Sequence, residues 1–372
     1  MKIGFDAKRA FLNGSGLGNY SRNLLNSLAQ SHKEHAYHLY TPRIGDQFPE
    51  ALAQESVFQT HGPVGWMRHF SALWRSRGIT QQLIKDEIDL FHGLSNELPS
   101  NIGIYPGKKV ITVHDLIFLR YPELYPGIDR ALYYTKVSQG CADADVVVAI
   151  SQQSKSDLIK FMNIPSSKIQ VVYQSCDAAF FNLCNADSSD RVKAKHALPS
   201  EYLLYVGTIE DRKNLLLIIE ALAQVKNIPL VVVGKKKPYF EKVQKRIVEL
   251  GLVNRVRFLD TVSNSDLPAL YQHAQAFLYP SFFEGFGIPI IEALASKIPV
   301  LTTAGGVFPE AGGPHSLYIN PNRADELASA ISLVLNNKDL RESMMLGGWE
   351  FVQQFTPANT ALKMALLYEG IK

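Results

Sequence analysis

Short apolar runs alternate with longer helix-like stretches along the whole chain. The runs are rich in Val, Ile, Leu and Tyr and cover residues 3–5, 37–40, 88–91, 110–113, 146–150, 202–206, 230–233, 256–259, 276–279 and 299–302. Most of them are continuously apolar, which is typical of strands buried on both faces of a parallel sheet. Strands that alternate with helices indicate βαβ units, so the pattern predicts an α/β protein with doubly wound parallel sheets.

The chain has room for about two such domains, because 372 residues correspond to roughly two units of about 150 residues. The polar stretch NLCNADSSDRVKAKHALPS separates the two sets of runs and is typical of a linker followed by a short helix. We therefore predict two Rossmann-like domains, residues 1–178 and 179–356, facing each other across a cleft. Ligands bind at the carboxyl ends of the strands in open α/β sheets, so the loops after the strands are the places to search.

Bulk charge argues against a nucleic-acid partner. Residues 1–180 carry 18 basic and 16 acidic side chains, and the remainder carries 20 and 19, so neither half has a basic excess. Three irregularly spaced cysteines suit neither a disulfide framework nor a zinc site and fit a reducing compartment. No apolar run is long enough for a signal peptide or a membrane span. We expect a cytoplasmic protein of undetermined oligomeric state.

The segment YPSFFEGFGIPIIEA begins at the end of a predicted strand and runs into a predicted helix. Pro289 suits a first helical position, and Gly285 and Gly287 let the backbone approach a ligand. The free N–H groups of a helix start favour an anion. With carboxylates at Glu284 and Glu292, the segment suits a ligand with both phosphate and vicinal hydroxyls, such as a nucleotide sugar. The structural alternative is a capped helix with two solvated acids.

Two adjacent cations lie in the segment VGTIEDRKN, which follows the apolar run at 202–206. Arg212 offers a rigid fork for phosphate and Lys213 a mobile point charge, so together they could hold a diphosphate without magnesium. A surface charge pair is the alternative. Lys235 follows another strand and could border a nucleotide pocket, with a solvated loop as the equal alternative.

The segment NGSGLGNY follows the first strand and fails the dinucleotide fingerprint, because it reads G-x-G-x-x-S and begins too far beyond the strand. We interpret Gly16 and Gly18 as part of a flexible loop that could lie along a diphosphate.

The segment VHDL ends the fourth strand. His114 could donate to a sugar hydroxyl or a phosphate, and Asp115 could act on an acceptor. A structural His–Asp pair is the alternative. His92 and Asn96 follow the third apolar run and could contact a ligand in the same way.

Together these residues resemble the retaining glycosyltransferases of family 4, which have the GT-B fold. The resemblance lies in the E-x7-E pattern of EGFGIPIIE, in VGTIEDRKN, in FLDTVSNSDLPALYQHAQAFLYPS and in ADVVVAISQQSKSDL, and it extends over nearly the whole chain. The opening DAKRAFLNGSGLGNYSRNLL is similar to a bacterial mannosyltransferase-like branch. One departure is VVYQSCDAAF, where family members carry Asn-Gly-Val-Asp.

The resemblance implies roles for individual residues. Glu284 would contact the donor sugar, Glu292 the ribose, Arg212 and Lys213 the diphosphate, His114 the sugar near its anomeric carbon and Asp115 the acceptor. The further donor-binding positions would be Gly16, Gly18, Lys235, Val262, Gly285, Phe286, Gly287 and Ile288. The family's terminal helix returns to the first domain, which residues 357–372 would do here.

We therefore expect a metal-independent, retaining hexosyltransferase without a cofactor. Its donor would be a nucleotide-diphosphate sugar (GDP-mannose first, a UDP-sugar second) and its acceptor a glycan or lipid-linked saccharide in cell-surface polysaccharide biosynthesis. A non-hydrolysing nucleotide-sugar epimerase and a nucleotide-sugar-binding protein without turnover are the alternatives.

A peripheral membrane contact is left open by residues 64–83, where Trp66, Phe70 and Trp74 recur every four residues among arginines. Packing of these aromatic residues into the core of the first domain is the favoured alternative.

Overall fold

The apolar runs form the strands of two parallel sheets in the computed structural model, which describes residues 1–14, 16–45, 47–48 and 57–371. The chain divides into two compact units, Met1–Ser175 with Phe355–Lys372, and Cys176–Gln354. The observed boundary, after Ser175, lies three residues before the predicted one after residue 178. The terminal helix belongs to the first unit.

The first unit is built on a seven-stranded sheet with the order β3-β2-β1-β4-β5-β6-β7, in which every neighbouring pair is parallel. Its strands are β1 (Lys2–Asp6), β2 (Ala36–Tyr40), β3 (Phe58–His61), β4 (Leu90–Gly93), β5 (Lys108–Val113), β6 (Val146–Ala149) and β7 (Ile169–Val171). Its helices are α1 (Lys8–Leu12), α2 (Gly16–Ser31), α4 (Ser71–Leu73), α5 (Ile79–Lys85), α6 (Ile117–Arg120), α7 (Gly127–Asp143), α8 (Gln152–Met162) and α17 (Pro357–Gly370).

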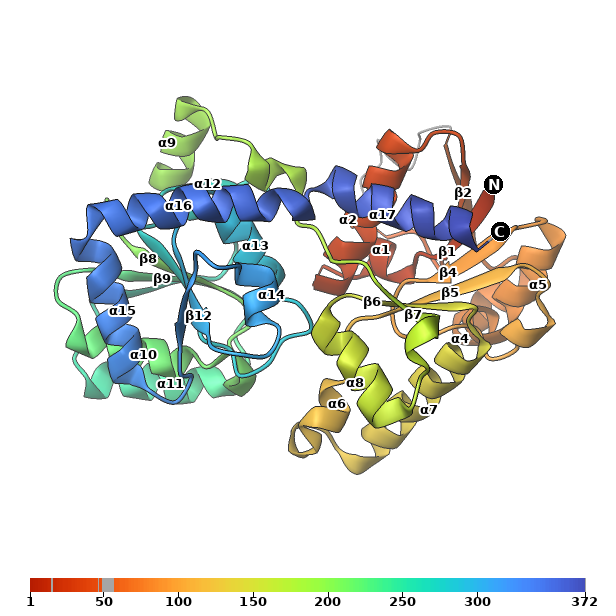
Figure 1. The fold of residues 1–372 in the computed structure, drawn as a ribbon, viewed down its shortest axis with the longest axis horizontal. Coiled ribbons are helices and arrows are strands. Elements are labelled where there is room, and N and C mark those ends of the chain that lie inside the picture. Colours follow the sequence, from red (N-terminus) through yellow and green to blue (C-terminus); the bar gives the residue numbers. More distant parts are fainter. Residues whose placement is uncertain (15, 46, 49–56, 372) are drawn as a thin grey trace. The chain divides into compact units, whose positions relative to one another are not determined.

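The second unit contains a six-stranded parallel sheet with the order β10-β9-β8-β11-β12-β13. Its strands are β8 (Leu203–Val206), β9 (Leu230–Val233), β10 (Val256–Leu259), β11 (Ala276–Tyr279), β12 (Val300–Thr303) and β13 (Leu317–Ile319). Its helices are α9 (Ala186–Lys195), α10 (Leu215–Gln224), α11 (Tyr239–Glu249), α12 (Leu267–Gln272), α13 (Ile288–Ala295), α14 (Phe308–Gly312), α15 (Ala324–Asn336) and α16 (Lys338–Val352). The helices of this unit form two groups. One group contains α10, α11 and α15, and the other contains α9, α12, α13 and α16, so both faces of the sheet are covered (Figure 1).

All ten apolar runs coincide with strands, and the predicted α/β class with two doubly wound parallel sheets is confirmed. Three strands were missed: β3, β7 and β13, each at the edge of its sheet. An edge strand has a partner on one side only and is partly exposed, as the sequence FQTH of β3 illustrates. Strands β3 (FQTH) and β7 (IQV) therefore carry polar residues, whereas β13 (LYI) is apolar but only three residues long.

Each sheet has a point where the strand order reverses. The chain builds β1, β2 and β3 toward one edge and then adds β4 on the other side of β1. In the second unit β11 adds beside β8 in the same way. Neighbouring strands leave a crevice at their carboxyl ends where the connections diverge, and ligands of open α/β sheets bind there. The loops after β1 and β4, and those after β8 and β11, are therefore the places for functional residues.

Two local expectations are corrected by the structure. The segment expected to be a flexible glycine loop instead begins helix α2 at Gly16, and Gly18 is buried in the first turn. Residues 64–83 form a series of short helical segments, in which the Phe70 side chain is 56% exposed and that of Trp74 is buried at 4%. These two rings do not share a face, and the side chain of Trp66 lies outside the described residues.

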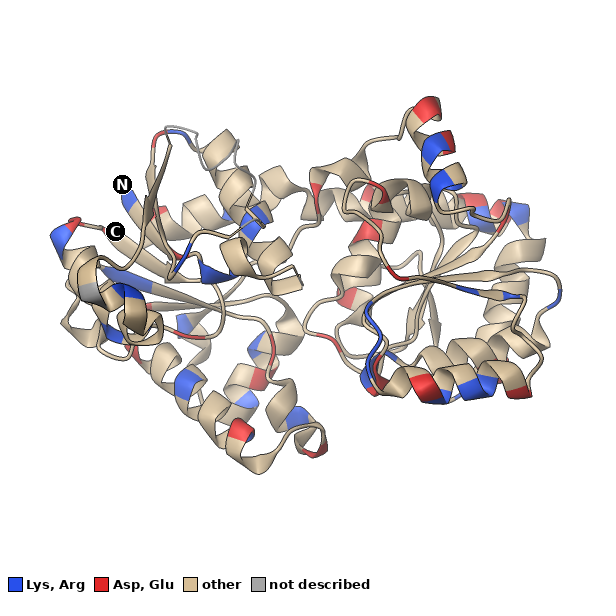
Figure 2. Cartoon of the chain, turned by 180° about the vertical axis from the view of Figure 1, so that it is seen from behind, with Lys and Arg blue, Asp and Glu red and all other residues tan. Residues whose placement is uncertain are grey.

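Charge is distributed over both units. Lysine and arginine alternate with aspartate and glutamate along the ribbons in Figure 2, as the nearly balanced composition implies. Among the described helices, none is both long and apolar enough to cross a membrane.

Candidate active site

The second unit holds a buried ionic cluster at its strand-order reversal. Lys213 follows β8 in a short helical turn, and Glu284 lies in the loop after β11. Glu284 Oε1 lies 2.9 Å from Arg212 Nη1 and 2.8 Å from Lys213 Nζ. Tyr279, the last residue of β11, donates its hydroxyl proton to the same oxygen over 3.0 Å and accepts from Lys213 Nζ over 2.5 Å. The strand-order reversal thus brings together residues that are about 70 positions apart.

Further contacts hold Arg212 in place. Its Nη1 donates to the carbonyl oxygen of Phe283 at 2.5 Å, and its Nη2 donates to Glu210 Oε1 at 2.9 Å. Lys237 Nζ pairs with the other oxygen of Glu210 at 2.5 Å. Three cations therefore face two carboxylates, and the cluster carries one net positive charge. A preorganised cationic group of this kind suits a diphosphate.

The electrostatics keep Glu284 ionised. Burial alone would raise the pKa of this carboxyl, but Lys213 and Arg212 outweigh it and hold the pKa at about 2. The sequence analysis predicted Arg212, Lys213 and Glu284 as separate elements, and the structure brings them into direct contact. It missed Tyr279 and Glu210, for which the position of a polar residue at or after the carboxyl end of a buried strand was the available signal.

Glu292 has a different environment from Glu284. It lies on α13 and is 8% exposed, and Tyr271 on α12 donates a hydrogen bond to its Oε2 at 2.8 Å. Burial raises the pKa of Glu292 to about 7, against the opposing effect of the Tyr271 hydrogen bond. The two acids of the E-x7-E pattern are thus one permanently charged carboxylate and one that titrates near neutrality.

The start of α13 fits the predicted geometry. Gly287 precedes the helix with a φ of 105°, which favours glycine, and Pro289 lies in the first turn. The adjoining Phe286 is buried, and Ile288 is the first helical residue. Gly285 completes the backbone loop between Glu284 and the helix.

Lys235 and Val262 lie in loops after β9 and β10. Strand β9 pairs with β8, and β10 pairs with β9, all in parallel, so both loops leave the same edge of the sheet as Arg212. Lys235 is exposed and Val262 is half-buried. Their placement agrees with a position near a bound base without defining a contact.

In the first unit, His114 is buried and fully hydrogen-bonded. Its Nε2 lies 2.8 Å from the carbonyl oxygen of Leu94, which can only accept, so Nε2 carries the proton. Its Nδ1 accepts from Gln174 Nε2 at 2.9 Å. Burial lowers the pKa of His114 to about 4. His114 could donate to a sugar hydroxyl only after its hydrogen bond to the carbonyl oxygen of Leu94 breaks. The sequence alone did not indicate Leu94 as a partner of His114. Gln174 belongs to the segment that departs from the family pattern.

His92 is a core histidine. Its ring contacts Tyr368 Oη at 2.7 Å and Thr112 Oγ1 at 2.8 Å, and burial lowers its pKa to about 3. It links β4, β5 and α17. Asn96 accepts from the backbone N–H of His114 at 2.8 Å and so supports that residue instead.

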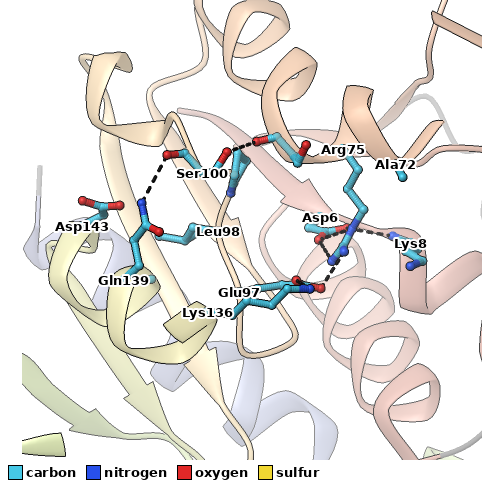
Figure 3. Close-up of a pocket in the computed structure, with 13 residues that line it drawn as sticks. Asp6, Lys8, Ala72, Arg75, Glu97, Leu98, Ser100, Lys136, Gln139 and Asp143 are labelled. Carbon is cyan, nitrogen blue, oxygen red and sulfur yellow. Dashed lines mark hydrogen bonds and ion pairs between the residues drawn. The ribbon is translucent and has the colours of Figure 1, made fainter. Parts of the chain in front are cut away.

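A cavity of about 320 Å³ lies at the strand-order reversal of the first unit. Figure 3 shows Arg75 extended between Asp6, at the end of β1, and Glu97, after β4. Arg75 Nη2 lies 2.5 Å from Asp6 Oδ2, and its Nη1 lies 2.6 Å from Glu97 Oε1. Lys136 on α7 pairs with the second oxygen of Glu97 at 3.1 Å. Sequence reasoning missed this network because Arg75 belongs to the segment considered for membrane contact.

A second cavity of about 290 Å³ shares Glu97 and Lys136 with the first. Asp115, Phe118 and Tyr133 also line it. Asp115 Oδ1 accepts from the backbone N–H of Ile117 at 3.1 Å. Carboxylates beside aromatic rings can bind hydroxyl groups and the apolar face of a saccharide.

Two family models match the chain. The model described as Glycosyltransferase Family 4 matches residues 14–180, and that described as Glycosyl transferases group 1 matches residues 187–346. The O-antigen chain mannosyltransferase B of Escherichia coli is 27% identical over 99% of this chain and 100% of its own. The O-antigen chain mannosyltransferase RfbU of Salmonella typhimurium is 32% identical over 60% of each chain. The solved structure of Anabaena HepE in complex with UDP and glucose is 19% identical in sequence to this chain. The two structures superpose with a TM-score of 0.78 over 100% of each chain.

The two models together include every described strand of both sheets except β1, and mannosyltransferase B aligns along 99% of the chain. The solved structure confirms the predicted GT-B fold. The family models and the mannosyltransferase relatives confirm the predicted nucleotide-sugar-dependent hexosyltransferase activity. The chain belongs to the glycosyltransferases of family 4, as the E-x7-E pattern and its companion segments indicated.

Proposed function

We propose that this chain transfers mannose from GDP-mannose to a saccharide acceptor during the assembly of a cell-surface polysaccharide, with retention of anomeric configuration and without a metal ion. The observation that carries the proposal is the contact of Glu284 with both Arg212 and Lys213. The names of the mannosyltransferase relatives support the sugar. A UDP-sugar is the second donor, supported by UDP in the HepE structure.

The donor would bind in the second unit. Arg212 and Lys213 would exchange part of their interaction with Glu284 for the diphosphate, and Lys237 would add a third charge. Backbone N–H groups at the start of α13 would assist. Glu284 would accept hydroxyl groups of the sugar, and Glu292, once ionised, would accept both hydroxyls of the ribose. These cations would stabilise the negative charge that develops on the departing nucleoside diphosphate.

The acceptor would bind in the first unit, in the two cavities that share Glu97 and Lys136. Its hydroxyl oxygen would attack the anomeric carbon on the face that the diphosphate leaves. The bond from this carbon to the phosphate oxygen breaks, and the leaving phosphate takes the hydroxyl proton. This route requires no protein nucleophile, and Asp115 would serve to orient the acceptor.

We place the reaction in the cytoplasm, supported by Cys141, Cys176 and Cys184, none of which forms a disulfide within the described part of the chain. Peripheral contact with the inner face of a membrane stays a prediction. The segment first considered for it places Trp74 in the core and commits Arg75 to Asp6 and Glu97.

Thermal unfolding with a panel of ligands tests the donor first. GDP-mannose, UDP-glucose, UDP-N-acetylglucosamine, GDP, UDP and NAD are compared with and without EDTA, because a ligand of the folded state raises the melting temperature. We expect GDP-mannose to give the largest shift, EDTA to leave that shift unchanged and Glu292→Ala to abolish it. A shift with NAD alone would refute the site.

Product analysis then tests the reaction. With an oligosaccharide acceptor and GDP-mannose, the new linkage should have the anomeric configuration of the donor in its NMR spectrum. Inversion would refute the proposed route. Conversion of the nucleotide sugar in the absence of any acceptor would identify an epimerase instead.

A further inference from the structure

A second group of ligand-type side chains lies in the first unit, away from the cavities described above. The sequence His32-Lys33-Glu34-His35 connects the end of α2 to the start of β2. Glu369, near the end of α17, joins it, because α17 packs along α2. The N- and C-termini lie close together in this region (Figure 1). The group adjoins the amino end of β2, whereas Asp6, Glu97 and Asp115 follow the carboxyl ends of their strands.

His35 is the unusual member of this group. Its side chain is only 4% exposed, and neither ring nitrogen has a hydrogen-bond partner among the described residues. Its Nε2 lies 3.7 Å from Glu34 Oε1, which is beyond hydrogen-bonding distance. A buried polar group without a hydrogen-bond partner is costly, and both ring nitrogens of this imidazole are therefore available to a ligand. Burial lowers the pKa of His35, which favours the neutral form that binds metal ions.

The neighbouring carboxylates supply the other ligands. Glu34, His35 and Glu369 each offer one ligand atom, and these atoms all lie within 4.8 Å of one another. The Nδ1 of His32 lies 3.2 Å from Glu34 Oε1 and so contacts this carboxylate from outside the group of three. Glu34 and Glu369 are exposed, so their side chains can close around an ion with bonds of about 2.0–2.2 Å. A neutral imidazole with two carboxylates carries two negative charges and matches a divalent cation.

We propose that Glu34, His35 and Glu369 bind one Zn²⁺ ion. The ion would give the buried His35 nitrogen a partner and would fasten α17 to the connection between α2 and β2. Because α17 follows the second unit in the chain, this link would secure the last segment of the first unit. The site would be structural and is separate from the proposed transfer reaction.

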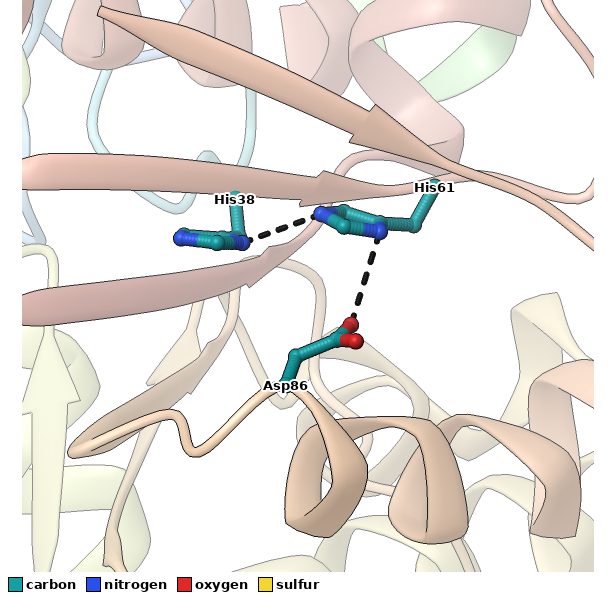
Figure 4. Close-up of side chains that lie close together, drawn as sticks. All are labelled: His38, His61 and Asp86. Atoms are coloured by element: carbon teal, nitrogen blue, oxygen red, sulfur yellow. Dashed lines mark hydrogen bonds and ion pairs between the residues drawn. The ribbon is translucent and has the colours of Figure 1, made fainter.

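Another cluster in the same unit, shown in Figure 4, provides an internal comparison. His38 Nδ1 lies 3.0 Å from His61 Nε2, and His61 Nδ1 lies 3.4 Å from Asp86 Oδ2. Tyr40 and Gln82 each donate to Asp86 over 2.8 Å. The facing groups of this cluster already contact one another by a hydrogen bond and an ion pair, so it needs no ion to satisfy them.

Calorimetric titration of the metal-stripped full-length protein with Zn²⁺ tests the proposal. We expect one ion per chain and a rise in melting temperature, since the ion binds the folded state. Glu34→Gln and Glu369→Gln alter exposed side chains and should leave the fold intact. Because losing an outer-shell partner already weakens metal binding about 10- to 100-fold, each variant should weaken it at least about 10-fold.

Two controls separate this site from other sources of binding. His61→Gln disables the comparison cluster, and Glu342→Gln removes an exposed carboxylate of the second unit; both should bind Zn²⁺ as the unmodified chain does. Absence of saturable one-site binding would overturn the proposal. So would binding that is lost in His61→Gln and kept in Glu369→Gln. Transfer activity is not needed for this readout, so the proposal stands or falls independently of the proposed function.

Discussion

Lys213 Nζ lies 2.8 Å from Glu284 Oε1, and each of these side chains is only 11% exposed. A buried ion pair is costly to break on one side, because the remaining charge loses its partner. Here the pair has a second use, since both groups are proposed to contact the donor. Binding would redistribute existing interactions among Lys213, Arg212 and Glu284.

Replacement of Glu284 should separate sugar contact from diphosphate contact. Glu284→Gln removes the proposed acceptor of sugar hydroxyls, and we expect turnover to fall by about 100-fold or more. Affinity for GDP should not fall, because Arg212 and Lys213 lose a competing carboxylate. Steady-state kinetics and calorimetry measure the two effects. Glu210→Gln removes another carboxylate partner of Arg212 and is the matched control; an equal loss of turnover in it would contradict a specific role for Glu284.

The pH dependence of donor binding should follow Glu292. Its pKa of about 7 in the folded protein exceeds the ordinary value of 4.5, because the side chain is buried. The folded state therefore holds one more proton between these values, and this group's contribution to the free energy of unfolding falls as pH rises from 4.5 through 7. Donor affinity should change in the opposite sense and rise through pH 7, because the ionised carboxylate accepts both ribose hydroxyls.

Glu292→Gln should remove both trends. Melting temperatures and donor dissociation constants between pH 5.5 and 8 provide the comparison with the unmodified protein. Parallel pH profiles for the two proteins would show that Glu292 does not titrate in this range.

Two glycines at the start of α2 should respond differently to alanine. A Cβ on Gly18 would lie 1.8 Å from the carbonyl oxygen of Asn13, whereas a Cβ on Gly16 meets nothing within 4 Å. We expect Gly18→Ala to lower the melting temperature markedly and Gly16→Ala to leave it nearly unchanged. If Gly16 approaches the diphosphate, Gly16→Ala will nevertheless weaken donor binding. Unchanged binding in that variant would exclude this role.

The hydroxyl of Tyr279 should stabilise the ionic cluster. Tyr279→Phe removes its hydrogen bonds to Lys213 and Glu284, and we expect a loss of about 1–3 kcal/mol in the free energy of unfolding. Tyr205→Phe is the matched control, because that buried hydroxyl makes a long bond of 3.2 Å to the carbonyl oxygen of Thr208. Urea unfolding measures both. A smaller loss for Tyr279→Phe than for Tyr205→Phe would mean that Lys213 and Glu284 hold each other without the phenol.

The central strands could be predicted because burial on both faces demands a continuous apolar run. The edge strands β3 and β7 could not, since exposure permits polar residues such as those of FQTH, and β13 is apolar but only three residues long. The helix start at Gly16 was missed for a related reason. Glycine residues suggest a loop, but Gly18 lies in a helix, and the carbonyl oxygen of Asn13 leaves no space for a Cβ at this position.

For the donor site, the residue types and the positions after strands identified Arg212, Lys213, Glu284 and Glu292 from the sequence alone. Those residue types supply the charges that a nucleotide sugar needs. Only the folded structure distinguished the two acids: cations surround Glu284, while burial without a cation in contact raises the pKa of Glu292. A pKa depends on all charges and solvent nearby, and these come from residues distant in sequence.

The fold class and the family could be predicted from the sequence, because hydrophobic periodicity and short motifs are local properties of the chain. The tertiary structure alone decided that His114 is fully hydrogen-bonded by Leu94 and Gln174, and that Arg75 links Asp6 to Glu97. It also placed Glu369 beside His35, a pair separated by 334 positions. The physical reason is that hydrogen bonds, ion pairs and burial depend on distance in space, which strand order and helix packing set.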